Sequence, residues 1–424
     1  MTISGRSANK SATVKRDLHE GRSIWAHSAW AGVPTERLQK TITADVAIVG
    51  AGISGAFMAD ALSKRYTKVV VLDRREPVHG STEASTALLQ FEIDQPLTKL
   101  SDQIGTRKAR AAWRRSWRTT RDLVELVHRE RIPCGLAERD TLYLAGDEMN
   151  GRALAKECRA RHAAGLPGLF LEADVLRSRF SIDREGAILS PGSAVANPVQ
   201  LSAGLLRRAV KRGATIYSET VVKDIDANAK RVLLRAGEHV VEAQVCVFCT
   251  GYETLKGLPS KGTKVSSTWA IASQPHAPLP AWLKHTLIWE ASDPYLYIRT
   301  EGNRLIVGGE DEEVASPRYR VRKLEKKAAT LVRKAEALIP DLHIRPAYRW
   351  TGAFGESSDG LPFIGAVPGM PGCFAVIGFG GNGTIYSLMA AQIIPTLLKG
   401  PRDPDAALFR FPGSGLRYYN TVPQ

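Results

Sequence analysis

The sequence DVAIVGAGISGAFMADALSKRYTKVVVLDRR, residues 45–75, decides the fold of this chain. The apolar run at residues 46–49 is too short for a helix and stops at Gly50, so it predicts a buried parallel strand. Gly50, Gly52 and Gly55 then follow the spacing G-x-G-x-x-G. In this pattern the first glycine permits a tight turn, and the second lets the backbone approach a pyrophosphate. The third glycine lets a helix pack closely on the strand.

The residues after the glycines complete the pattern. A helix that begins near Ser54 directs its free N–H groups and the positive end of its dipole toward the pyrophosphate. A second apolar strand, residues 69–72, ends in Asp73, about 20 residues after the glycines, where an acid can hold ribose hydroxyls. We therefore predict a dinucleotide site in a Rossmann-like unit with a parallel sheet.

The length of 424 residues is too great for one hydrophobic core and predicts two domains. The net charge is +15, and much of it lies in the N-terminal tail and in a predicted helix at residues 107–131. That helix combines arginines with Trp113 and Trp117, which fits a contact with nucleic acid or anionic lipid. It also fits a solvated face beside a buried tryptophan stripe. We favour this second interpretation and expect no nucleic-acid partner.

Membrane, disulfide and metal functions find no support in the sequence. No apolar stretch reaches the ~20 residues that span a bilayer, and the N-terminus lacks the apolar core of a secretory signal, so we expect a cytoplasmic protein. Cys246 and Cys249 lie three apart on a predicted strand and point to opposite faces, so we expect buried structural cysteines. The histidines have no metal-ligand spacing, and no metal site is predicted.

The order of elements after residue 75 points to a discontinuous nucleotide domain. Residues 231–245 predict a hairpin that leads into a buried strand at 246–250. Residues 265–309 alternate apolar and polar side chains in several segments, which predicts a half-buried antiparallel sheet. The chain finishes with an apolar strand at 374–377, a second glycine loop and an apolar helix through Leu398.

Four segments in this order carry a family resemblance. They are GAGISG (50–55) with LDRR (72–75), HGSTEASTALLQ (79–90), CTGYE (249–253), and DGLPFIG (359–365) followed by GFGGNGTIYS (378–387). The chain resembles the D-amino-acid oxidase (DAO) superfamily of FAD-dependent oxidoreductases, which includes glycine oxidase and sarcosine oxidase. The resemblance implies bound FAD and an α/β fold class. The fold would comprise a Rossmann-like FAD-binding domain, discontinuous in sequence, and an antiparallel-sheet α+β substrate domain.

We assign approximate boundaries to these parts. Residues 1–20 are expected to be a mobile basic tail. The FAD-binding domain is expected to comprise residues 21–105, 191–255 and 351–424, and the substrate domain residues 106–190 and 256–350.

The resemblance also implies a role for individual residues toward FAD. The first glycine loop would line the diphosphate, Asp73 and Arg74 would reach the adenosine ribose, and Val222 would meet the adenine. The second glycine loop opens a helix whose N-terminus favours the reduced, anionic flavin. The full set of predicted FAD-binding residues is Gly50, Gly52, Ile53, Ser54, Gly55, Asp73, Arg74, Arg75, Ser81, Thr82, Ser85, Thr86, Ala87, Leu88, Val222, Thr250, Gly251, Gly380, Gly381, Asn382, Gly383 and Thr384.

The chain departs from the family pattern at the substrate. In glycine and sarcosine oxidases an arginine that binds the substrate carboxylate precedes the D-G-x-x-x-I-G segment by five residues, and this chain has Phe354 there. Arg299 is a candidate for that role from another direction, with a surface salt bridge as the alternative. No cysteine occurs at residues 349–365 and no histidine at 82–87, so FAD is expected to be non-covalent.

The predicted reaction is oxidation of the C–N bond of an amine or amino acid. Hydride would pass from the α-carbon to the flavin N5, and the imine product would hydrolyse in water. The catalytic candidates are Arg299, Tyr297 and Gln90. The candidates for an aromatic wall that excludes water are Tyr295, Tyr297, Trp289, Trp269 and Phe354, with plain sheet core as the alternative, and Glu290 joins Gln90 as a group that could orient the amine. Oxygen, a quinone or a carrier protein could reoxidise the flavin, and the oligomeric state is open.

Two alternatives come from other classes of protein. An NAD(P)-dependent dehydrogenase would explain residues 45–75 and the aspartate at position 73, where the family usually has glutamate, but not the second glycine loop. A flavin-bearing subunit or nucleic-acid-associated flavoprotein would explain the basic helix at residues 107–131.

Overall fold

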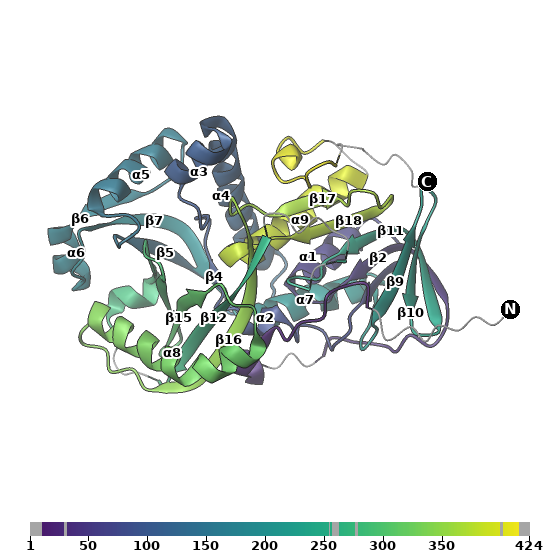
Figure 1. Ribbon diagram of the computed structural model, residues 1–424, viewed down its shortest axis with the longest axis horizontal. Coiled ribbons are helices and arrows are strands. Elements are labelled where there is room, and N and C mark those ends of the chain that lie inside the picture. The colour runs from purple at the N-terminus through teal and green to yellow at the C-terminus, as the bar shows by residue number, and fades with distance from the viewer. Residues whose placement is uncertain are drawn as a thin grey trace.

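The computed structural model describes residues 11–28, 32–253, 255–256, 263–275, 279–398 and 402–414. Two β-sheets lie side by side in it, each covered by helices (Figure 1). The predicted α/β fold class is confirmed.

The first sheet has eight strands among the described residues and is parallel at its centre. Its strands are β2 (Ile42–Val49), β3 (Val69–Leu72), β8 (Thr215–Tyr217), β9 (Val222–Ala227), β10 (Val232–Ala236), β11 (His239–Phe248), β17 (Phe363–Ala366) and β18 (Cys373–Ile377). They run in the order β17, β18, β11, β2, β3 and β8, and the antiparallel ribbon of β9 and β10 extends from β11. Both β3 and β18 are buried along their whole length, as parallel strands are when both faces of a sheet are covered.

The second sheet has ten strands in the described part of the chain and is largely antiparallel. They are β1 (His19–Arg22), β4 (Leu88–Leu89), β5 (Ala137–Leu144), β6 (Leu169–Glu172), β7 (Gly186–Val195), β12 (Thr263–Ser273), β13 (Thr286–Glu290), β14 (Leu296–Glu301), β15 (Arg304–Glu312) and β16 (Pro346–Ser357). The order is β1, β16, β12, β15, β14, β13, β5, β7 and β4, with β6 paired to β7. The antiparallel sheet predicted at residues 265–309 is confirmed, although β13 also pairs with β5 in parallel.

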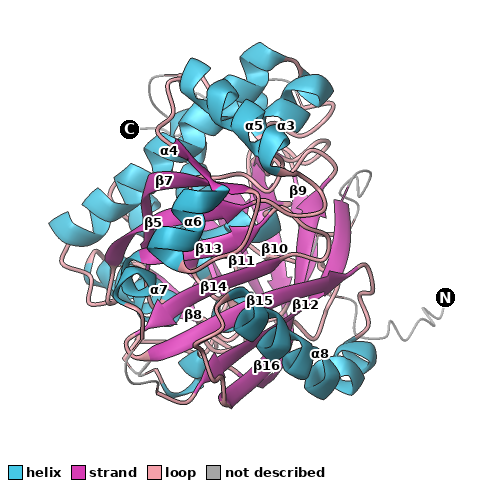
Figure 2. Cartoon of the chain, turned by 90° about the vertical axis from the view of Figure 1, so that its left-hand side faces the viewer, coloured by secondary structure: helices cyan, strands magenta, loops and turns pink. Residues whose placement is uncertain are grey.

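Helices cover both sheets. They are α1 (Ile53–Leu62), α2 (Ser81–Ala84), α3 (Leu97–Ile104), α4 (Thr106–Arg129), α5 (Gly151–Ala163), α6 (Ala173–Phe180), α7 (Pro198–Lys211), α8 (Pro317–Leu338) and α9 (Gly383–Leu398). Side chains of α1, α4, α7 and α9 share one core with Val46 and Ile48 of β2, whereas alternate residues such as Ala47 pack under the ribbon of β9 and β10. On the second sheet, α8 packs across β12, β15 and β16 (Figure 2).

Residues 11–28 of the N-terminal segment are described and make defined contacts. The expectation of a mobile tail is therefore wrong for residues 11–20, and residues 1–10 lie outside the described residues. The backbone N–H of Ala12 donates to the carbonyl of Val222 at 3.0 Å, and β1 pairs with β16. These contacts join positions far apart in the sequence, so the polar composition of the segment gave no sign of them.

Strand pairing places residues across the expected domain boundaries. The strand β16 runs through the boundary at residues 350 and 351 and pairs with β12, and β7 runs through the boundary at 190 and 191. The helix α4, expected in the substrate domain, contributes Trp113 and Leu123 to a core that includes residues of both sheets, such as Val46 of β2 and Trp350 of β16.

The basic helix and the cysteines behave as structural elements. On α4, Arg115 pairs with Asp403 at 2.9 Å, and Arg118 pairs with Asp405. These pairs favour the interpretation that the helix is a packed structural element. All five cysteines are free and buried, and no group of metal-binding side chains occurs among the described residues. No described helix has the length and apolar character needed to cross a membrane.

Candidate active site

One cavity of about 620 Å³ is bounded by both sheets, a volume typical of ligand pockets. It is lined at one end by the carboxyl end of β2 and the start of α1. At the other end it is lined by residues of the second sheet, such as Tyr297 of β14 and Phe354 of β16. The two sheets therefore enclose the cavity between them.

The first glycine loop forms one wall of this cavity. Gly50 has a φ of 109°, and a Cβ atom there would collide with the carbonyl oxygen of Cys249, so only glycine fits. Gly52 precedes the first residue of α1, and the N–H of Ile53 donates to the hydroxyl of Thr82 at 3.0 Å. Gly55 does not line the cavity, because it packs against the backbone of Gly50 as the spacing predicts. The N-terminus of α1 thus faces the cavity with its positive dipole end.

Asp73 is held in place by the first glycine loop. Its carboxylate accepts the N–H of Ala51 at 2.6 Å and the N–H of Arg75 at 2.8 Å. Burial raises the pKa of Asp73, and the two backbone N–H groups oppose this rise. Asp73 lines the cavity, where the lone pairs left over can accept ribose hydroxyls.

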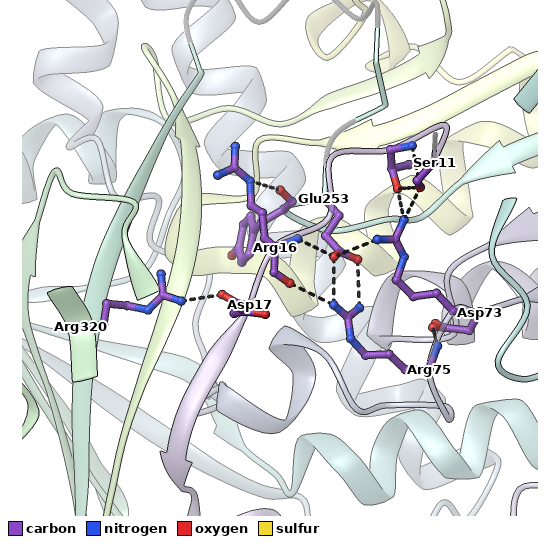
Figure 3. A network of polar contacts seen from close by, with 10 residues as sticks. Ser11, Arg16, Asp17, Asp73, Arg75, Glu253 and Arg320 are labelled. Carbon is purple, nitrogen blue, oxygen red and sulfur yellow. Dashed lines mark hydrogen bonds and ion pairs between the residues drawn. The ribbon is translucent and has the colours of Figure 1, made fainter. Parts of the chain in front are cut away.

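Glu253 pairs with both arginines that follow Asp73. Its contact with Arg75 is drawn in Figure 3. Arg75 makes two hydrogen bonds of 2.9 Å to the carboxylate of Glu253, and Arg74 lies 3.4 Å from it. The backbone N–H of Arg16 donates to the same carboxylate at 2.9 Å, which ties the N-terminal segment to the cavity. Sequence reasoning assigned no role to Glu253, although it ends the quoted segment CTGYE. The paired guanidinium groups are therefore partly committed to this network.

The second glycine loop forms the opposite wall. Gly380–Asn382 make one turn of 3-10 helix, and α9 begins at Gly383. The N–H of Gly381 donates to the carboxylate of Asp94 at 2.7 Å, and the side-chain amide of Asn382 donates to the carbonyl of Glu92 at 2.6 Å. Nothing in the local sequence around Asp94 predicted this contact. The contact places the carboxylate of Asp94 beside the positive end of the α9 dipole. This charge offsets part of the positive electrostatic potential expected there.

The hydroxyls of Ser54 and Ser387 join the two walls at 2.7 Å. The two glycine loops, far apart in the sequence, therefore lie on the same cavity. All the predicted FAD-binding residues line it except Gly55.

Unpaired polar atoms show that the cavity suits a polar ligand. The hydroxyls of Ser81 and Thr250 are buried, line the cavity and have no hydrogen-bond partner among the described residues. Such groups are costly unless a ligand or water satisfies them. The glycine cradle, the helix N-termini and these hydroxyls fit the diphosphate and ribityl chain of FAD.

Aromatic side chains line the end of the cavity next to the second sheet. Tyr143 and Trp289 stack with ring centroids 3.9 Å apart, and the rings of Tyr295 and Tyr297 lie 5.8 Å apart. Together with Phe354, these rings form what we call the aromatic chamber. Burial, with the nearby carboxyl of Asp311 adding to it, raises the pKa of both Tyr295 and Tyr297 well above the usual range, so they remain neutral.

Trp269 does not belong to the aromatic chamber. It is fully buried in the core between the second sheet and α8, and its indole N–H donates to the carbonyl of Arg320 at 3.2 Å. The alternative of plain sheet core is the correct one for this residue.

The structure contradicts the predicted substrate role of Arg299. The side chain is completely buried and does not line the cavity. Its guanidinium donates to the carbonyls of Thr86, Ala87 and Ala196 at 3.0–3.2 Å and pairs with Glu301. Arg299 instead holds the backbone of Thr86 and Ala87, two members of the predicted FAD-binding set, in place.

Gln90 and Glu290 both line the cavity, but they differ in whether the side chain is free to bind a ligand. Glu290 accepts a hydrogen bond from Arg184 at 2.9 Å. Gln90 is only 7% exposed, and its side-chain carbonyl oxygen has no partner among the described residues. Of the catalytic candidates, Gln90 and Tyr297 are therefore placed for contact with a ligand.

A dinucleotide fold with a second glycine loop across the cavity, beside an aromatic chamber, defines a flavin-dependent oxidoreductase. Residues 45–395 match the family described as "DAO: FAD dependent oxidoreductase", and the chain belongs to this family. It is an FAD-dependent enzyme. The alternative of an NAD(P)-dependent dehydrogenase is therefore wrong.

Relatives and solved structures agree with this family. The chain is 26% identical over 368 residues to the glycine oxidase of Geobacillus kaustophilus (strain HTA426), covering 84% of this chain and 93% of the relative. It is 24% identical over 401 residues to the gamma-glutamylputrescine oxidoreductase of Escherichia coli (strain K12), covering 92% of both. The crystal structure of the Geobacillus glycine oxidase superposes with a TM-score of 0.71 at 22% identity, over 88% of this chain and 99% of that one. This structural similarity shows that the two proteins share a fold.

Proposed function

We propose that this protein oxidises the C–N bond of an amine or amino acid to an imine, which water then hydrolyses to a carbonyl compound and an amine or ammonia. The observation that carries the proposal is the single cavity that runs from the two glycine loops to the aromatic chamber. One continuous space can therefore hold the cofactor and the substrate together.

The cofactor end of the cavity is assigned by its polar groups. The N-terminus of α1 would bind the diphosphate of FAD, Asp73 the ribose, and the hydroxyls of Ser81 and Thr250 further polar atoms of the cofactor. When bound there, FAD supplies the hydride acceptance by which a carbon–nitrogen single bond becomes a double bond.

The chain's own residues orient the substrate and exclude water from it. The rings of Trp289, Tyr297 and Phe354 exclude water from the substrate end of the cavity. The free carbonyl oxygen of Gln90 can accept an N–H of the substrate amine and so fix the direction of its nitrogen lone pair. No acid–base pair is needed for a substrate amine that enters neutral.

The names of related proteins support a nitrogen-bearing substrate. Glycine oxidase and gamma-glutamylputrescine oxidoreductase are among the relatives, and a solved iminodiacetate oxidase has a TM-score of 0.69. Oxygen, a quinone and a carrier protein are the candidate electron acceptors, and the reoxidation rate of the reduced protein with each would identify the acceptor.

The test is anaerobic reduction of the purified yellow protein. Primary amines, N-methyl amines, and D- and L-amino acids are mixed in turn with the protein, and the visible flavin absorbance is followed. The proposal predicts that at least one of these classes bleaches the flavin and yields a carbonyl product. If none bleaches a flavin that dithionite reduces fully, the proposal is wrong.

A further inference from the structure

The cavity has an excess of acidic side chains, although the chain as a whole carries a net charge of +15. The cationic side chains that line its described part are Arg74, Arg75 and Lys99. The two arginines pair with Glu253, and Lys99 pairs with Glu148 at 2.6 Å. No cation in the described lining is therefore left to bind a substrate carboxylate.

Several acids of the lining are neutralised from outside the cavity. These pairs are Glu290 with Arg184 at 2.9 Å, Glu312 with Lys327 at 2.7 Å, and Glu313 with Lys264 at 2.7 Å. In contrast, Asp94, Asp311 and Glu356 line the cavity and make no ion pair among the described residues. These three acids come from a loop, from β15 and from β16, so the fold gathers them from separate parts of the sequence.

Asp311 is the most exceptional of the three. Both of its carboxylate oxygens are buried and make no ion pair in the described part of the chain, and the hydroxyls of Thr268 and Tyr295 are polar groups beside them. Burial raises the pKa of Asp311 to about 7. The carboxylates of Glu356 and Asp94 add to this rise, and the hydroxyls of Thr268 and Tyr295 oppose it. A buried carboxylate of this kind is stabilised by a cation, and the described residues offer none.

Other groups that line the cavity also suit a cation. Tyr295, Tyr297 and Trp289 line the same cavity, and the faces of aromatic rings attract ammonium groups. The unpartnered carbonyl oxygen of Gln90 is a further acceptor for an ammonium N–H. Phe354 adds an apolar surface and no charge.

We propose that the substrate is an amine of net positive charge that lacks a carboxylate beside its reacting carbon, and that Asp311 binds its ammonium group as counter-ion. This inference rests on the proposed function, because it names the substrate class of the same cavity. The reacting nitrogen must lose its proton before oxidation, so a substrate with a second, permanently protonated nitrogen satisfies both requirements.

The test measures binding to the FAD-bound protein without turnover. The probes are benzyltrimethylammonium, benzoate and benzyl alcohol, which share a ring and differ in charge, and the readout is the perturbation of the flavin absorption spectrum. We expect benzyltrimethylammonium to bind about tenfold or more tightly than benzoate. Tighter binding of benzoate than of the cation would overturn the inference.

Variants locate the effect at Asp311. Asp311→Asn should weaken the binding of benzyltrimethylammonium by about tenfold and leave that of benzyl alcohol unchanged. Asp311→Glu should keep the preference for the cation. Asp183→Asn makes the same charge change at a side chain that is 87% exposed, and it should change nothing. Unaltered cation binding in Asp311→Asn would refute the role of this residue.

The outcomes separate this inference from the proposed function. If neutral or zwitterionic amino acids bleach the flavin and benzoate binds best, the proposed function stands and the inference fails. If the cation binds through Asp311 but no amine or amino acid reduces the flavin, the charge preference stands and the proposed function fails. Should Asp311→Asn not fold, the comparison of the three probes on the unaltered protein still tests whether the cavity prefers a cation.

Discussion

The hydroxyls of Ser54 and Ser387 lie 2.7 Å apart, although 333 positions separate them in the sequence. Ser387 donates its proton to the carbonyl of Gly383 at 2.6 Å, so Ser54 is the donor in the bond between the two serines. Ser54 lies in the first turn of α1 and Ser387 in the first turns of α9, and both are buried. The bond therefore fixes the two glycine loops relative to each other.

Because the bond joins two helices, the two serines should be energetically coupled. In a double-mutant cycle of Ser54→Ala and Ser387→Ala, we expect a coupling free energy of about 1 kcal/mol in urea unfolding of the holoprotein. Ser202 provides a matched control, since its hydroxyl donates to the carbonyl of Pro198 within α7. The pair Ser54→Ala and Ser202→Ala should be additive. Additivity in the Ser54 and Ser387 cycle would contradict the account of this bond.

Gly52→Asp should abolish retention of FAD. The substitution places a Cβ atom 3.1 Å from the hydroxyl of Thr82 and a negative charge at the N-terminus of α1, where the diphosphate is predicted to bind. The flavin-to-protein absorbance ratio after desalting is the measurement. Gly237→Asp is the control, because Gly237 lies in the exposed turn between β10 and β11 with open space around it, and aspartate tolerates its left-handed backbone. A Gly52→Asp protein that stays as yellow as the control would disprove the site assignment.

Glu253→Gln should destabilise the protein and loosen its N-terminal segment. The buried carboxylate of Glu253 accepts hydrogen bonds from Arg75 and from the backbone of Arg16, so its loss leaves those donors poorly satisfied. We expect a loss of about 2 kcal/mol in unfolding free energy. Glu242→Gln, which breaks the exposed pair with Arg231, should cost less than about 0.5 kcal/mol. Equal effects of the two variants would show that the network contributes little.

Phe354→Arg should shift substrate preference toward compounds that carry a carboxylate. The side chain lies on β16 and lines the aromatic chamber, so an arginine there introduces a cation into a cavity whose described cations are all paired. The measurement is the ratio of flavin reduction rates with an amino acid and with the amine of the same side chain. We expect the ratio to rise by about tenfold. A ratio equal to that of the unaltered protein would show that Phe354 does not face the substrate carboxylate position.

Asp311 should make the stability of the folded protein depend on pH. Its folded-state pKa of about 7 lies above the ordinary aspartate pKa of 3.8 in the unfolded chain, so the folded state keeps a proton that the unfolded state has lost. The favourable contribution is present below the unfolded pKa and is lost as the pH rises through 7. Thermal unfolding at several pH values should therefore show that Asp311→Asn gains stability relative to the unaltered protein as the pH rises. The carboxyls of Glu356 and Asp94 face the same site and strengthen this trend. A constant difference in melting temperature between the two proteins would contradict the raised pKa.

Local patterns explain which features were predictable from the sequence. The spacing of Gly50, Gly52 and Gly55 is set by backbone geometry within one turn, so it predicted the strand, the loop and α1 correctly. The second glycine loop was predictable for the same reason. Because these motifs are local in sequence, the family resemblance identified residues that line the cavity, with Gly55 as the exception.

Long-range contacts explain the errors. Arg299 sits on an alternating strand, but its neighbours are three backbone carbonyls that only the folded chain brings together. The polar segment at residues 11–20 reads as a tail until Glu253 and β16 supply its partners. Asp94 and Asp311 belong to no sequence motif, and their importance follows from a cavity that the sheets create.

A crystal structure of the protein purified with its own flavin tests whether the two glycine loops bind one cofactor. We expect one FAD, with its diphosphate against the loop at residues 50–54 and its tricyclic ring beside the loop at residues 380–384. Density for the cofactor at only one of these loops, or at neither, would contradict this expectation.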